Sequence, residues 1–186
     1  MIYVALLRGI NVGGNNKVNM KELKTVFEEA GMSAVKTYIN SGNIMFAAST
    51  HAKGELSDIL EGAIHSHFGL AIKVLVYDLG NFQRIAASIP EDWSNDKDMK
   101  SDVWFLWDEV DDQSVLEQLT IKPDIDRVKY VPGAVLSSVD RDKVTKSGLS
   151  KIIGTRLYKL VTVRNVNTVR KLLELMREME IVEKQK

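Results

Sequence analysis

Hydrophobic and polar residues alternate with two periodicities in the first half of the chain, one typical of strands and one typical of helices. Short apolar runs predict strands over 2–8, 34–39, 43–47 and 72–77. Apolar residues at helical spacing predict helices from near Asn19, a plausible N-cap, to Gly31 and from about 54 to 68, with a short further helix ending at Pro90. The order of elements is therefore β-α-β-β-α-β.

The second half repeats this order without visible residue-level identity. Strands are predicted over 102–107, 125–131, 134–139 and 158–163, and helices over 113–119, over 143–153 and from near Asn167. We therefore predict an α+β protein with two ferredoxin-like subdomains, each with an antiparallel sheet, and an extra C-terminal helix. The expected domains are 1–90 and 101–186, joined by a polar linker over 91–100.

This topology has a consequence for the position of two polar loops. Because the crossovers are handed, the third strand is expected between the first and second, antiparallel to both. The first and second strands then end at the same edge of the sheet. We therefore expect the Gly- and Asn-rich loop over 9–16 to lie beside the tight turn over 40–42.

The strands are apolar on both sides. The first has Ile2, Val4 and Leu6 on one side and Tyr3, Ala5 and Leu7 on the other. Strands of this kind are covered on both faces. We expect the open face of each sheet to be covered by the other half or by a second copy of the chain, in which case the protein is a homo-oligomer.

Composition and charge narrow the function classes. The chain has 25 Lys and Arg residues, 25 Asp and Glu residues and no Cys. Zero net charge argues against binding of DNA or a membrane surface by bulk charge, and the missing thiols exclude disulfides and thiolate metal sites. The opening apolar run is too short to span a bilayer. We expect a cytoplasmic protein without a metal site, because its three histidines have no suitable partners in the sequence.

The loop and turn contain the first group of candidate ligand-binding residues. A strand, a Gly-rich loop and a helix start are the parts of an anion cradle, in which backbone N–H groups point outward. The candidates are Arg8, Asn11, Gly13, Gly14, Asn15 and Lys17 from the loop and Tyr38, Asn40, Ser41 and Asn43 from the turn. The glycine spacing matches neither a P-loop nor the dinucleotide fingerprint. The alternative is a loop that uses Gly for positive φ and Asn for local capping.

A second group ends the last strand and opens the last helix. It contains Arg164, Asn165 and Asn167, and Arg170 and Lys171 follow. We expect Asn167 to cap the helix, and cations at a helix start need an anion or a carboxylate nearby. The alternative is solvated charge with a salt bridge.

Three stretches resemble family 1697 of the domains of unknown function. They are Leu6–Gly14, Thr37–Asn43 and Thr162–Leu172, and the resemblance runs the length of the chain. Val166 stands where relatives usually have Trp. The resemblance implies a bacterial cytosolic protein with two ferredoxin-like subdomains and no established activity. Both candidate groups lie in the signature stretches of the family.

Three functions follow as hypotheses. The first is binding of a small anionic or phosphorylated ligand, such as a nucleotide, at the Gly- and Asn-rich loop. The second is RNA binding by the same polar edge, which zero net charge makes the weaker of the two. The third is an enzyme acting on a phosphate-bearing substrate, with Arg8 and Lys17 as electrostatic stabilisers. The sequence shows no obvious base or nucleophile, and it leaves enzymatic activity, cofactors and the ligand open.

Overall fold

The computed structural model describes residues 1–52 and 54–185. Within this part the chain divides into two compact units. The first unit contains Met1–Gln83 and the segment from Leu172 onward, and the second contains Arg84–Lys171. Each unit contains one four-stranded antiparallel sheet.

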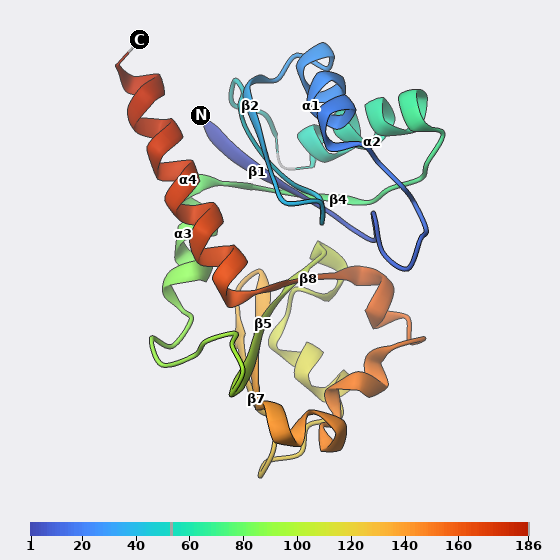
Figure 1. Ribbon diagram of the computed structural model, residues 1–186, viewed down its shortest axis with the longest axis vertical. Helices are drawn as coiled ribbons and strands as arrows, with labels where there is room; N and C mark the ends of the chain where they lie inside the picture. The colour runs from blue at the N-terminus through green and yellow to red at the C-terminus, as the bar shows by residue number, and fades with distance from the viewer. Residues whose placement is uncertain (53, 186) are drawn as a thin grey trace. The chain divides into compact units, whose positions relative to one another are not determined.

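The sheet of the first unit has the strand order β2-β3-β1-β4. Figure 1 labels β1, β2 and β4 of this sheet. Its strands are β1 (Ile2–Leu7), β2 (Ser33–Tyr38), β3 (Asn43–Ala47) and β4 (Val74–Asp78). The third strand lies between the first and second and is antiparallel to both, as the sequence predicted. The ends of β1 and β2 therefore lie at one edge of the sheet.

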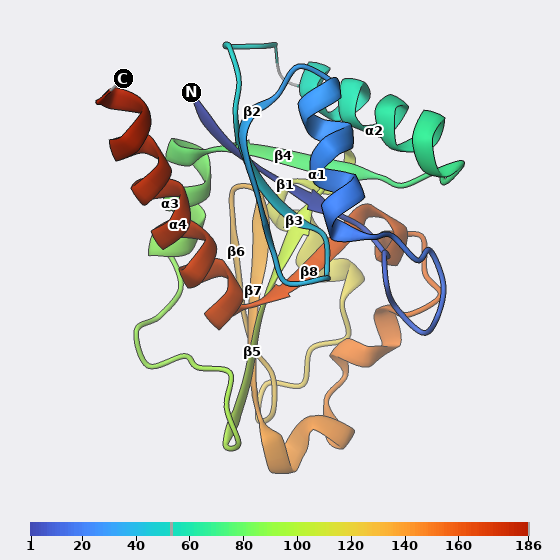
Figure 2. The same cartoon turned by 45° about the horizontal axis from the view of Figure 1, so that its top comes forward.

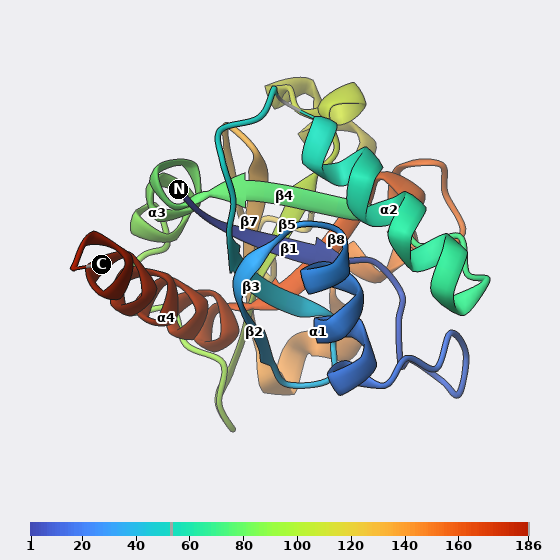
Figure 3. The ribbon, with the colours of Figure 1, turned by 90° about the horizontal axis from the view of Figure 1, so that it is seen from above.

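Two helices, α1 (Met20–Glu29) and α2 (Glu55–Phe68), lie over one face of this sheet (Figure 3). Each buries an apolar stripe, with Leu23, Val26 and Phe27 in α1 and Leu56, Leu60 and Ile64 in α2. Each such side chain contributes about 1.5–3 kcal/mol when fully buried. Asn19 caps α1 as predicted, since its side chain accepts hydrogen bonds from the backbone N–H groups of Lys21 and Glu22.

Both faces of β1 are buried, as its apolar pattern predicted. On one side Tyr3, Ala5 and Leu7 join the core beneath α1 and α2. On the other side Ile2, Val4 and Leu6 are at most 3% exposed. The strand is thus buried on both sides along its whole length.

The sheet of the second unit has the order β6-β7-β5-β8, which is the same arrangement as in the first (Figure 2). Its strands are β5 (Met99–Leu106), β6 (Arg127–Val131), β7 (Ala134–Asp140) and β8 (Val161–Asn165). Its connections differ from those of the first unit, because they are 3-10 helices: η1 (Asp108–Val110), η2 (Gln113–Gln118), η3 (Arg141–Lys146), η4 (Leu149–Ile152) and η5 (Leu157–Leu160). The strand predicted over 158–163 therefore begins only at Val161.

The prediction of one helix over 143–153 is wrong, because a buried carboxylate interrupts the backbone there. Asp126 is 4% exposed. It accepts a hydrogen bond from Ser147 Oγ at 2.5 Å and another from the backbone N–H of Gly148 at 3.1 Å. This N–H group is then not available to a helical carbonyl. The segment consequently forms η3 and η4 instead of one α-helix.

Two further helices, α3 (Leu79–Ala87) and α4 (Val166–Lys184), each contribute residues to both units. The polar stretch between α3 and β5 is ordered by the second unit. Arg170 Nη1 donates to the Trp93 carbonyl at 2.7 Å and Nη2 to the Pro90 carbonyl at 3.1 Å, and Trp93 itself is buried. None of the described helices is long and apolar enough to cross a membrane.

Replacement of Ile39 by Asn is expected to stabilise the protein. Ile39 has φ 49° and is 52% exposed. Its left-handed backbone conformation therefore costs conformational energy that burial of the side chain does not offset. Left-handed geometry costs an L-residue about 1–2 kcal/mol, and Asn tolerates it better. We expect the free energy of unfolding in urea to rise by about 0.5–1 kcal/mol. Ile153→Asn is the control, since Ile153 is 67% exposed at φ −58° and should show no gain; an equal gain there would refute the strain argument.

Replacement of Gly42 by Ala is expected to destabilise the protein more than the same change at Gly31. Both have positive φ, at 84° and 93°. A Cβ on Gly42 would lie 2.8 Å from Leu7 Cβ and 3.1 Å from Ile10, whereas Gly31 has open space. We expect a loss of about 2–5 kcal/mol at Gly42 from strain and overpacking, and about 1–2 kcal/mol at Gly31 from strain alone. Urea unfolding of both variants measures the difference, and equal losses would show that the turn does not pack tightly.

Candidate functional site

The loop that follows β1 is held in shape by its own backbone and by asparagine side chains. The backbone N–H of Asn15 donates to the Val12 carbonyl at 2.9 Å. The backbone N–H of Asn11 donates to the backbone carbonyl of Asn16 at 3.1 Å. Asn16 Nδ2 donates to the Gly9 carbonyl at 3.0 Å. Asn11 and Asn16 have φ 52° and 47°, a region that Asn tolerates better than most residues. The alternative considered from the sequence, a loop in which Asn side chains cap nearby backbone groups, therefore describes much of this segment.

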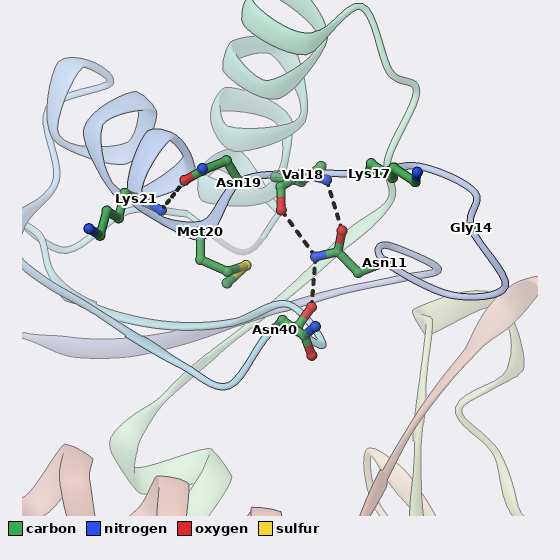
Figure 4. Close-up of a pocket in the computed structure, with 8 residues that line it drawn as sticks. All are labelled: Asn11, Gly14, Lys17, Val18, Asn19, Met20, Lys21 and Asn40. Carbon is green, nitrogen blue, oxygen red and sulfur yellow. Dashed lines mark hydrogen bonds between the residues drawn. The ribbon is translucent and has the colours of Figure 1, made fainter.

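The side chain of Asn11 joins the loop to the neighbouring turn (Figure 4). Its Oδ1 accepts from the backbone N–H of Val18 at 2.9 Å, and its Nδ2 donates to the Val18 carbonyl at 3.1 Å. The same Nδ2 donates to the Asn40 carbonyl at 2.8 Å. One amide thus closes the base of the loop and holds it beside the turn, as the topology predicted.

The turn over 40–42 is held by a hydrogen bond from β1 and by hydrogen bonds among its own residues and their neighbours. The backbone N–H of Leu7 donates to the Gly42 carbonyl at 2.8 Å. Asn43 is fully buried, and its Nδ2 donates to Ser41 Oγ at 2.9 Å and to the Tyr38 carbonyl at 3.2 Å. Asn43 and Ser41 are therefore parts of the turn's internal bonding.

An open pocket of about 530 Å³ lies along the loop, the turn and the start of α1. Its lining residues are Asn11, Gly14, Lys17, Val18, Asn19, Met20, Lys21 and Asn40. Lys17 and Lys21 lie at its two ends, and the Met20 side chain points from α1 towards the turn (Figure 4). No carboxylate belongs to the lining, so the charged groups of this pocket are both cations.

The N-cap of α1 occupies two backbone N–H groups that an anion could otherwise bind. Asn19 Oδ1 already accepts from the N–H groups of Lys21 and Glu22, at 2.9 and 3.3 Å. In the described part of the chain, the N–H groups of Gly13 and Gly14 form no hydrogen bond. The lining thus offers an anion the lysine ammonium groups and the N–H group of Gly14, with the helix dipole as a smaller contribution.

The lining residues carry lysine ammonium groups, asparagine amides and backbone N–H groups, which can bind an anion. The lining has no imidazole, carboxylate, thiol or hydroxyl that could act as a general base or a nucleophile. Among the described residues, no group of three or more His, Asp or Glu is arranged to hold a metal ion. The polar groups that line this pocket are therefore lysine cations and asparagine amides.

The structure brings together only some of the residues that the sequence selected. Asn11, Gly14, Lys17 and Asn40 line the pocket, whereas Gly13 and Asn15 do not. The other candidates of the first group, Arg8, Tyr38, Ser41 and Asn43, do not line it. The sequence analysis missed Lys21, although its position two residues after a good N-cap places it in the first turn of α1.

The second candidate group belongs to the second unit, where most of its polar atoms have protein partners. Arg164 is buried and donates from Nη1 to Thr162 Oγ1 at 3.0 Å and to the Val163 carbonyl at 2.9 Å. Burial lowers the pKa of Arg164 to about 10, so the guanidinium stays charged at neutral pH. Asn167 Nδ2 donates to the Asn95 carbonyl at 2.8 Å.

The capping residue of the last helix lies two residues earlier than expected. Helix α4 begins at Val166, and Asn165 Oδ1 accepts from the Thr168 N–H at 2.9 Å. Asn165 is therefore the capping residue and the prediction for Asn167 is wrong. Arg170, whose charge at a helix start seemed to require an anion, instead binds the two backbone carbonyls of Pro90 and Trp93.

Comparisons with known proteins place the chain in a family. The model of a family described as a protein of unknown function, DUF1697, matches residues 1–136. No curated protein matches the chain. Among solved structures, it is similar to the conserved bacterial protein SP0830 from Streptococcus pneumoniae, with 28% identity and a TM-score of 0.80 over 94% of this chain and 98% of that one. On the strength of the family match, this chain belongs to the DUF1697 family of proteins of unknown function.

Proposed function

We propose that the pocket beside α1 binds a small anionic ligand that carries a phosphate group, in the manner of a nucleotide. The observation that supports this most is an open pocket of about 530 Å³ with Lys17 and Lys21 at its ends and no carboxylate in its lining. Neither lysine forms an ion pair with any residue that the structure describes. An anion in the pocket would lie between these two cations.

The strength of this attraction is modest because both lysines are exposed. Two unit charges 4 Å apart attract by about 4 kcal/mol at an effective dielectric constant of about 20, and water and salt reduce this further. The start of α1 adds about 0.3–1 kcal/mol for a negative group. These values favour binding in the micromolar to millimolar range, with a clear dependence on salt.

The shape and the apolar part of the pocket favour a ligand larger than phosphate alone. A volume of about 530 Å³ lies within the usual range for small-molecule sites, about 300–1,000 Å³. Val18 and Met20 add apolar surface between the two lysines. A phosphorylated molecule with an apolar or aromatic part, such as a nucleotide, uses both kinds of lining.

The proposal covers the loop and turn of the first unit. Arg8, Tyr38, Ser41 and Asn43 lie outside the pocket lining, and binding roles for them stay predictions from the sequence. Binding roles for Arg164, Asn165 and Asn167 of the second unit stay predictions from the sequence.

Calorimetric titration with ADP, inorganic phosphate and adenosine, without added metal, tests the proposal. We expect ADP to bind more tightly than phosphate, and adenosine to bind at least tenfold more weakly than ADP because it lacks the anion. Replacing both Lys17 and Lys21 by Ala should raise the Kd for ADP at least tenfold, and 0.5 M NaCl should weaken binding similarly.

Lys24→Ala is the matched control, since Lys24 lies on the same helix, pairs with Glu28 at 3.7 Å and does not line the pocket. It should change the Kd for ADP less than twofold. Absence of binding by every phosphate compound, or equal effects of the control and the double variant, would refute the proposal. Tight binding of a short single-stranded RNA without binding of ADP would favour the RNA-binding hypothesis instead.

A further inference from the structure

The second unit contains a separate cavity of about 250 Å³ that the sequence analysis did not anticipate. Strands β5, β7 and β8 form its floor, and η3, η4 and the segment up to η5 form its opposite wall. Its volume equals about eight water molecules at liquid density. This is just below the usual range for drug-sized ligands and suits a molecule with a single ring.

Most of the cavity wall is apolar, and the floor has one charged pair. Residues paired across antiparallel strands share a face, so Asp102 lies beside Ser137, and Trp104 lies beside Val163. Trp104 Nε1 donates to Ser137 Oγ at 2.9 Å, which satisfies the indole. The remaining polar feature of the floor is the carboxylate of Asp102 with the ammonium of Lys100, which lies two residues earlier on the same face.

This pair offers an acceptor and a donor side by side. Lys100 Nζ lies 2.9 Å from Asp102 Oδ2, with side-chain exposures of 45% and 12%. In the described chain Lys100 supplies the one hydrogen bond that this carboxylate accepts, although a carboxylate has about four acceptor positions. The ammonium likewise has donors left. Because the two charges cancel, the pair suits a neutral ligand better than a cation or an anion.

We propose that this cavity binds a small uncharged ring compound with a carboxamide-type edge. The ring would occupy the apolar space beside Trp104 and Leu149. The N–H of the amide would donate to Asp102, and its carbonyl would accept from Lys100. This site is independent of the phosphate pocket, because every residue that lines it belongs to the second unit.

Benzamide and benzoate test this proposal, since the two molecules have the same shape and differ in charge and in donors. Titration into ¹⁵N-labelled protein at pH 7 should give saturable shifts for benzamide at the amides of Asp102, Trp104 and Val163. The expected Kd is on the order of 1 mM, as suits a ligand of about nine non-hydrogen atoms. Benzoate should bind at least tenfold more weakly, because Asp102 repels it.

Asp102→Asn should reverse this preference. The variant keeps the shape of the side chain, adds an N–H donor and leaves Lys100 as an unopposed cation, so benzoate should bind more tightly than benzamide. Asp140→Asn is the control, because Asp140 is ion-paired with Arg127 and Lys143 in the same unit and lies outside the cavity lining. It should keep the preference for benzamide. An unchanged preference in Asp102→Asn overturns the proposal.

Ser150→Trp keeps the test decisive if Asp102→Asn does not fold. Ser150 is exposed and lines the cavity, so an indole there should block the cavity without disturbing the core. We expect loss of benzamide binding at an unchanged melting temperature, whereas Ser114→Trp, at an exposed position in η2, should retain binding. Benzamide binding that survives in Ser150→Trp, or no saturable shift in the wild type at 10-fold the expected Kd of about 1 mM, rejects the site.

Discussion

The side-chain amide of Asn11 is the contact on which the candidate phosphate site depends. It bonds both backbone groups of Val18 and the carbonyl of Asn40, at 2.8–3.1 Å, so that loop, helix start and turn share one anchor. Each hydrogen bond contributes about 0.5–1.5 kcal/mol, and leaving a buried partner unpaired costs more. Because this anchor and the Asn19 cap fix the backbone, Gly13 and Gly14 can present N–H groups that have no other use in the described chain.

The first unit could be predicted from the sequence because its signals are local and mutually consistent. The apolar stripe of α1, the cap at Asn19 and the handed crossover together determine the strand order and place the loop beside the turn. The pocket lining could be predicted only in part. Lys21 lies in the first turn of α1, at a position that the sequence pattern assigns to the solvent-exposed face of the helix. It lines the pocket only because the loop lies next to it in three dimensions.

The second unit differs from the prediction at places where hydrogen bonds between residues far apart in the sequence outweigh the local hydrophobic pattern. The carboxylate of Asp126 takes the N–H of Gly148, 22 residues away, and divides a segment with helical spacing into two 3-10 helices. Arg170 looked like an unpaired cation because its partners are backbone carbonyls, which no sequence pattern reveals. The cavity over β5 could not be predicted either. In the sequence, Lys100 and Asp102 look like ordinary exposed charges of a strand, and only the three-dimensional structure shows that they line a cavity.

The central claim is that phosphate groups bind between Lys17 and Lys21. The most direct measurement is a titration of ¹⁵N-labelled protein with inorganic pyrophosphate, followed by amide chemical shifts. We expect saturable changes concentrated at Gly13, Gly14, Lys17 and Lys21, with Lys24 and the second unit unaffected. Changes that do not saturate, or that concentrate away from this loop, would contradict it.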